Sequence, residues 1–220
     1  MTAASQIYLE QAYQRQVYLA VELLDAVTLT RVGRGMEVVA EGLKKKPVIN
    51  RSNYFVWLKE GNAIVPKITV DPGLLPYEKR EILPANVVFP LTTIELQPRP
   101  DYQFAPGITG LRGTVIERQV DPPVPVVNGT VRLQYMDADD DWQDSPTVSR
   151  TDERTGDFVS IIRLTPADEP AVENGAITVR LRVTRGFSSR RSEDFQLMYG
   201  RVTDPTESDP LKFAWDDMLP

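Results

Sequence analysis

Residues 137–144 contain five aspartates, and these are the side chains of this sequence best suited to binding chemistry. Carboxylate oxygens are the ligands that Ca²⁺ prefers, so calcium binding is the first chemistry to consider. A helix-flanked calcium loop, however, needs glycine at its sixth position and a carboxylate at its twelfth. Counted from Asp137, those positions hold Trp142 and Val148. We therefore interpret the run as the solvated acidic tip of a β-hairpin and predict no metal site, with calcium binding as the alternative.

The commonest catalytic arrangements are excluded, because the chain contains no histidine and no cysteine. It can form no disulfide, no thiolate nucleophile and no Ser-His-Asp triad. The acidic pairs Glu193-Asp194 and Asp216-Asp217 do not replace them, since neighbours on a strand point to opposite faces and cannot flank one bond. We predict no catalytic residue and no cofactor, and an enzyme is the least favoured class of function.

Basic residues form two groups. Lys44, Lys45 and Lys46 precede Pro47, and we expect them at a solvated hairpin tip rather than in a phosphate-binding patch. A second group of arginines could form a positive strip on one sheet face, where we expect nearby acids to pair with them. This group is Arg180, Arg182, Arg185, Arg190 and Arg191.

Net charge and hydropathy limit the partners. Residues 1–101 carry a net charge of +1 and residues 102–220 a net charge of −7, so the chain lacks the basic footprint of a nucleic-acid-binding protein. No apolar run is long enough to span a membrane. Met1 to Leu9 lacks the basic and apolar regions of a cleaved signal. We expect synthesis in the cytoplasm.

Hydrophobic patterning indicates strands almost throughout. Val17 to Leu23 and Ile177 to Val183 alternate apolar and polar residues, as in strands with one buried face. Tyr54 to Leu58 is a continuous aromatic and β-branched run, typical of a core strand. Further strands are predicted at 36–43, 67–70, 92–96, 111–116, 130–135, 158–164 and 195–199.

The turn signals between these short strands favour an all-β fold of two tandem antiparallel β-sandwich domains, Ig-like or transthyretin-like, with short terminal arms. The cluster of Pro98, Pro100 and Pro106 predicts a semi-rigid connector. The predicted parts are a first sandwich with an N-terminal arm (1–98), the connector (99–106), a second sandwich (107–201) and a C-terminal arm (202–220).

Similar segments recur in the same order in both halves, which indicates two copies of one topology. The matched pairs are 35–39 with 129–133, 50–58 with 151–159, and 68–73 with 181–186.

The second half carries short motifs of a known family: Gly113-Thr114-Val115, Asn128-Gly129-Thr130-Val131, Thr151-Asp152, and Gly156 with Phe158. In these motifs it resembles the carboxypeptidase regulatory-like domains, a transthyretin-like β-sandwich family. The spacing departs from the family by an extra residue between Asp152 and Gly156. In the first half Asn53 stands where the family usually has glycine, and asparagine tolerates a positive φ. The resemblance implies a fold far more than a function.

The C-terminal segment combines polar turns with large apolar side chains that must pack somewhere. We predict that it binds another protein, because large aromatic residues are typical interface anchors, and packing onto the second sandwich is the alternative. The predicted protein-binding residues are Leu211, Phe213, Trp215, Met218 and Leu219.

The function favoured by these observations is a non-enzymatic structural or adaptor subunit of a multiprotein assembly, of the kind found in a phage tail or contractile injection particle. Its partners would be other protein subunits, a second copy of the chain included, within a virion or secreted particle. The alternative is a cell-surface or carbohydrate-binding β-sandwich module.

Overall fold

A computed structural model describes residues 16–59, 64–118, 122–164, 168, 170–206 and 211–220. The fold is all-β, and within these residues the only helices are two 3₁₀ turns, η1 (Pro84–Asn86) and η2 (Trp215–Asp217). No helix of the described residues is long and apolar enough to cross a membrane. The predicted N-terminal arm, residues 1–15, lies outside the described residues.

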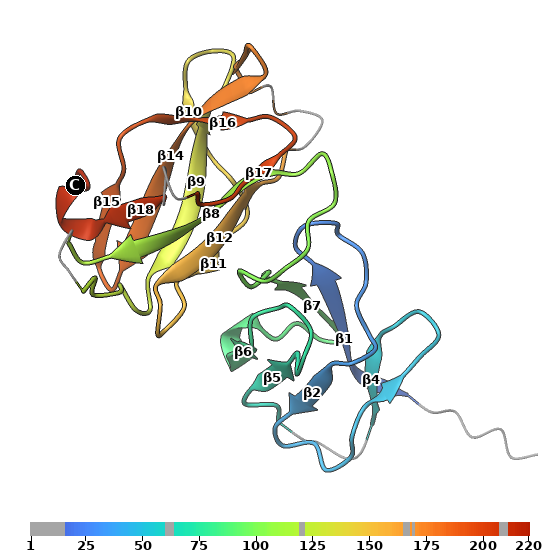
Figure 1. Cartoon of the computed structure of the whole chain (residues 1–220). Coiled ribbons are helices and arrows are strands. Elements are labelled where there is room, and N and C mark those ends of the chain that lie inside the picture. The colour runs from blue at the N-terminus through green and yellow to red at the C-terminus, as the bar shows by residue number, and fades with distance from the viewer. Residues whose placement is uncertain (1–15, 60–63, 119–121, 165–167, 169, 207–210) are drawn as a thin grey trace, which may run out of the picture.

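Two sheets form the N-terminal half, which we define as residues 16–98 (Figure 1). The first has the strand order β3-β4-β1-β7 and the second the order β2-β5-β6. The strands are β1 (Val17–Asp25), β2 (Glu37–Ala40), β3 (Val48–Ile49), β4 (Phe55–Leu58), β5 (Ile68–Asp71), β6 (Arg80–Ile82) and β7 (Leu91–Leu96).

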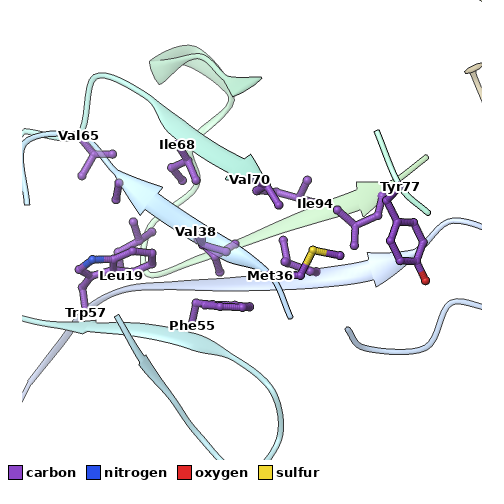
Figure 2. Close-up of a cluster of buried hydrophobic side chains, with 14 of the residues drawn as sticks. Leu19, Met36, Val38, Phe55, Trp57, Val65, Ile68, Val70, Tyr77 and Ile94 are labelled. Atoms are coloured by element: carbon purple, nitrogen blue, oxygen red, sulfur yellow. The ribbon is translucent and has the colours of Figure 1, made fainter. Parts of the chain in front are cut away.

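Both sheets contribute to one hydrophobic cluster (Figure 2). Leu19 and Phe55 reach it from the first sheet, and Val38 and Ile68 from the second. These side chains point inward because successive residues of a strand face opposite sides of the sheet. The alternation read along β1 is therefore the pattern of a strand with one face in this cluster.

The C-terminal half, residues 107–220, also contains two sheets. In one of them β9 lies between β10 and β14, and in the other β8 lies between β12 and β17. The strands are β8 (Thr109–Ile116), β9 (Thr130–Met136), β10 (Trp142–Asp144), β11 (Ser149–Arg150), β12 (Asp157–Ile162), β13 (Val172–Glu173), β14 (Ala176–Arg185), β15 (Ser188–Arg191), β16 (Phe195–Met198), β17 (Val202–Thr203) and β18 (Lys212–Ala214).

A second hydrophobic cluster fills this half. Val115 and Phe158 reach it from β8 and β12, and Leu133 and Leu181 from β9 and β14. Each of these four side chains is essentially inaccessible to solvent. As in the N-terminal half, one cluster is shared by two sheets.

The structure confirms the all-β class, and each strand predicted from sequence has a counterpart. The expectation of purely antiparallel pairing is wrong in both halves: β7 is parallel to β1, and β17 and β18 are parallel to β8. A long stretch of chain, part of it in the other sheet, separates each of these strands from β1 or β8. Parallel pairing needs such a long connection, because a tight hairpin can join only antiparallel strands.

Pairing relationships agree with the internal sequence repeat. β2 pairs antiparallel with β5 as β9 does with β14. β1 pairs antiparallel with β4 and parallel with β7, while β8 pairs antiparallel with β12 and parallel with β17 and β18. The matched segments thus occupy equivalent places in the two halves.

The connector, residues 99–106, contacts both halves. Tyr102 is buried, and its hydroxyl donates to Asp25 Oδ2 at 2.5 Å. From β8, the Arg112 guanidinium donates to the carbonyl oxygens of Pro100 at 2.8 Å and Tyr102 at 2.5 Å. These bonds hold the connector between the end of β1 and the start of the C-terminal half.

Direct contacts also join the halves. Ile161 of β12 is buried in the hydrophobic cluster of the N-terminal half. Arg163 forms an ion pair with Glu95 at 3.1 Å and donates to Ala26 O at 3.3 Å. Across the same junction, the backbone N–H of Arg150 donates to a Glu78 carboxylate oxygen at 3.2 Å.

Candidate functional site

A groove with a volume of about 470 Å³ opens between β2 and the β3–β4 pair. Its walls are mainly apolar, and Lys44, Lys45 and Lys46 stand at its rim. We call it the lysine groove. Its lining residues are Met36, Glu37, Val38, Val39, Ala40, Leu43, Lys44, Lys45, Lys46, Pro47, Ile49, Phe55 and Trp57.

The floor of the lysine groove is the edge of the N-terminal core. Val38 from β2 and Phe55 and Trp57 from β4 line it, and Figure 2 shows these side chains lying between the two strands. All three are buried, at 3% exposure or less. The predicted core role of Phe55 and Trp57 is therefore confirmed, and the same two rings also form part of the groove.

Residues 41–47 carry the chain from one sheet to the other, so the lysines do not lie at a hairpin tip as expected. β2 belongs to the β2-β5-β6 sheet, whereas β3, which follows the lysines, pairs with β4. The Trp57 indole N–H donates to Lys45 O at 3.1 Å and fixes this crossing against the core. The three lysine side chains are exposed, as predicted.

Apolar side chains are exposed along both borders of the groove. Val39 on β2 and Ile49 on β3 both line the groove, and each is 46% exposed. Single exposed apolar residues are ordinary, but apolar residues gathered beside a groove mark an interaction surface. With the lysines, they define a surface suited to an apolar segment that carries negative charge.

The tail residues predicted to bind a partner lie against the C-terminal half instead of forming a free arm. β18 pairs with β8, with Phe213 opposite Val115. Trp215 and Met218 are 8% and 7% exposed and belong to the hydrophobic cluster of that half, and Leu211 and Phe213 pack against it. Four of the five predicted residues therefore contribute to this chain's own core.

Leu219, the fifth predicted residue, is 50% exposed. Its backbone and that of Arg191 exchange two hydrogen bonds of 2.8 and 2.9 Å. Nearby, the Arg190 guanidinium lies 4.9 Å from the Trp215 ring centroid and donates to Trp215 O at 2.6 Å. The structure thus has the tail in the alternative placement, packed on the second half. Binding of a partner by these residues stays a prediction.

The acidic run forms the predicted hairpin between β9 and β10. Asp137 Oδ1 accepts the backbone N–H groups of Asp139 at 3.0 Å and Asp141 at 2.9 Å, and Gln143 donates to Oδ2 at 2.7 Å. The Gln143 bond, followed by the backbone bonds, lowers the pKa of Asp137. Within the described residues, no three acidic side chains come close enough together to hold a metal ion.

The arginines of the predicted strip mostly have acidic or aromatic neighbours. Arg182 pairs with Asp144 at 2.5 Å, Arg185 with Glu117 at 2.5 Å, and Arg190 lies 3.8 Å from Asp216. Arg180 donates to Gln134 at 2.7 Å, and its guanidinium lies 4.0 Å from the centroid of the Trp142 ring. The register puts Arg180, Arg182 and Arg191 on the outer face of the sheet and Arg185 and Arg190 on the opposite face. The five arginines therefore do not form one strip, and neighbouring acids offset much of their positive charge.

The N-terminal half also contains a buried polar centre that the sequence did not predict. Asp25, 4% exposed, accepts the hydroxyls of Tyr77 at 2.9 Å and Tyr102 at 2.5 Å, and the backbone N–H groups of Val27 and Thr28. Burial, and then the bond to Asp25, raises the pKa of both tyrosines. The only sequence signal of this centre is Asp25 itself, a carboxylate at the end of an apolar strand. That signal does not reveal hydrogen-bond partners far along the chain.

The lysine groove was not predicted either, because it results from a missing strand neighbour of β2 rather than from a sequence motif.

No protein-family model, curated protein or solved structure matches this chain.

Proposed function

We propose that this protein is a non-enzymatic structural or adaptor subunit of a multiprotein assembly, and that the lysine groove binds a segment of a partner subunit. The two halves would be tandem β-sandwich modules, of the transthyretin-like type that the motifs of the second half suggest. The shared core in each pair of sheets and the common pairing pattern support this finer description.

The observation that carries the proposal is the composition of the lysine groove. Apolar walls offer an area that a partner can desolvate, and each Å² removed from water contributes about 25 cal/mol. Lys44, Lys45 and Lys46 add charge selectivity at the rim. The absence of histidine and cysteine from the sequence supports a binding role over an enzymatic one.

Connection between the halves is a second requirement of an adaptor, since a subunit that joins partners must hold them in a fixed relation. Tyr102 is bonded to Asp25, and Arg112 is bonded to the connector carbonyls. The Arg163–Glu95 ion pair adds a direct link. A setting in a phage tail or contractile injection particle remains part of the proposal.

The test is purification from the native host with the Ile49→Asp variant, which puts a negative charge on the border of the lysine groove. Ile49 is half exposed, so the fold should tolerate the change. Val172→Asp is the matched control, because Val172 is 47% exposed on a short strand of the other half. We expect the partner to be lost from Ile49→Asp and retained by Val172→Asp. Equal recovery with both variants would contradict the proposal.

A further inference from the structure

Strand β9 has a covered edge, and its counterpart in the internal repeat, β2, does not. β9 pairs with β14 on one side, and both β10 and β11 pair with it as well. β2 pairs with β5, and the described residues provide no strand for its other side. One sheet thus ends at a strand that is internal in the equivalent sheet.

Different routes of the chain cause this difference. After β9, residues 137–141 turn back so that β10 forms a hairpin with β9, with Trp142 opposite Met136. After β2, residues 41–47 cross to the other sheet, where Val48 and Ile49 pair with β4. The place that β10 and β11 fill in the C-terminal half lies beside the lysine groove in the N-terminal half.

The free edge of β2 presents particular backbone groups. Glu41 N–H donates to Lys67 O at 2.9 Å, which continues the β2–β5 ladder. Because bonding direction alternates along an antiparallel strand, Val39 bonds toward β5, while Val38 and Ala40 direct their N–H groups to the outer edge. Val38 and Ala40 are 3% and 2% exposed and line the lysine groove, so a further strand reaches these two amides by entering the groove.

We propose that an extended segment of a partner protein adds to β2 as a further strand, antiparallel to it as β10 is to β9. The segment carries apolar side chains that enter the lysine groove and aspartate or glutamate side chains that face Lys44, Lys45 and Lys46. Charge complementarity at the rim selects an acidic segment over a neutral or basic one. This inference rests on the proposed function and specifies how that site binds.

Amide hydrogen exchange with a synthetic probe tests the pairing. The probe is a peptide of alternating valine and aspartate, about ten residues long, the upper length of common strands. We expect saturable binding and at least tenfold slower exchange at Val38 and Ala40, with little change at Val39. A valine–lysine peptide should bind at least tenfold more weakly, and so should the valine–aspartate peptide to a variant with all three rim lysines changed to glutamate.

Backbone methylation of the probe separates strand addition from simple groove filling. Methylation removes the donors that a ladder needs, so the methylated peptide should lose most of its affinity. Equal binding of the methylated peptide, or binding without protection of Val38 and Ala40, overturns strand addition. The Ile49→Asp purification still decides the proposed function in that event. Absence of saturable binding by the valine–aspartate peptide also overturns the inference.

Two further measurements exclude other occupants. If light scattering shows that the purified chain is a dimer, and Val38 and Ala40 are protected only in that dimer, a second copy is the occupant. If these amides are protected in the monomer and deletion of residues 1–15 exposes them, the chain's own N-terminal segment is the occupant. Either result overturns the assignment to a partner protein, whereas a monomer with rapidly exchanging Val38 and Ala40 supports it.

Discussion

The two halves share one pairing pattern but differ in how they end the sheet that contains their second strand. In the C-terminal half β10 and β11 cover β9, whereas in the N-terminal half β2 remains at the edge beside the lysine groove. Local sequence after that strand decides the outcome. Asp137 binds two backbone amides of a tight turn, and Asp140 takes the positive φ of 64° that the turn needs.

After β2 the chain also turns, with Leu43 N–H donating to Ala40 O at 3.2 Å and Gly42 at a positive φ, but it then follows a longer path to the other sheet. Residues 41–47 include three consecutive lysines and Pro47, which donates no backbone hydrogen bond. The crossing is held instead by the bond from Trp57 to Lys45. One connecting segment can therefore leave a repeated topology closed in one copy and open in the other.

The largest predicted effect compares two buried aromatic residues of corresponding strands, Phe158 on β12 in the closed half and Phe55 on β4 in the open one. Both are essentially buried, so truncation to alanine should cost roughly 3–5 kcal/mol of unfolding free energy. We expect Phe158→Ala to lie at the upper end of this range, because Phe55 borders a groove into which neighbours and water can relax. Urea unfolding of both variants measures the difference. A larger loss of unfolding free energy for Phe55→Ala would contradict the expected difference between the two halves.

Trp215 tests whether the tail belongs to the closed half. It is 8% exposed within the C-terminal cluster, and Trp215→Ala should lower the unfolding free energy by about 3 kcal/mol. The matched control is Leu219→Ala, at a half-exposed position of the same tail, which should cost less than about 1 kcal/mol. Thermal denaturation of the two variants is the measurement. Similar small losses for both would show that the tail does not contribute to the core.

The smallest effect concerns the polar centre of the open half. Tyr102→Phe removes a hydrogen bond to the buried Asp25 carboxylate, which should cost about 1–2 kcal/mol. Both tyrosines have a pKa raised above the ordinary value of 10.0. Their stabilising contribution is therefore complete below pH 10 and declines as the pH rises above it, because the unfolded chain loses these protons first.

Unfolding free energies measured between pH 8 and pH 11 test whether stability falls as the pH rises above 10. The wild-type protein should lose stability above about pH 10, and Tyr102→Phe should show a shallower decline because one of the two shifted groups of the polar centre is gone. A variant as steep as the wild type would assign the alkaline loss to other groups. In the C-terminal half, burial and then Asp168 raise the pKa of Tyr135 to about 12, so Tyr135 adds an alkaline loss that is common to both proteins.

The all-β class and the long strands were predictable from sequence because apolar alternation directly reflects burial on one face. β1 and β14 are the clearest cases. The short strands β3, β11, β13 and β17, of two residues each, were not predictable, because pairing with a neighbour defines them and two residues carry no periodicity. Parallel pairing was missed for the same reason: it depends on where a distant segment returns.

Candidate sites were less predictable than the fold. An apolar tail must bury its side chains against some surface, but its sequence does not say whether that surface belongs to the same chain. Here β18 pairs with β8, and Trp215 packs into the hydrophobic cluster of the C-terminal half. The lysine run was visible, yet its meaning depends on the groove beside it. Asp25 required Tyr77 and Tyr102, which lie 52 and 77 residues away, to become a buried centre.

Strand β12 has a consequence for how the molecule unfolds. Phe158 near its start lies in one hydrophobic cluster, and Ile161 three residues later lies in the other. Unfolding of either half would therefore remove packing contacts from the other half and expose apolar surface there. The two halves should behave as a single cooperative unit and give one calorimetric transition whose enthalpy matches the van't Hoff value. Separately expressed halves would lose this shared support.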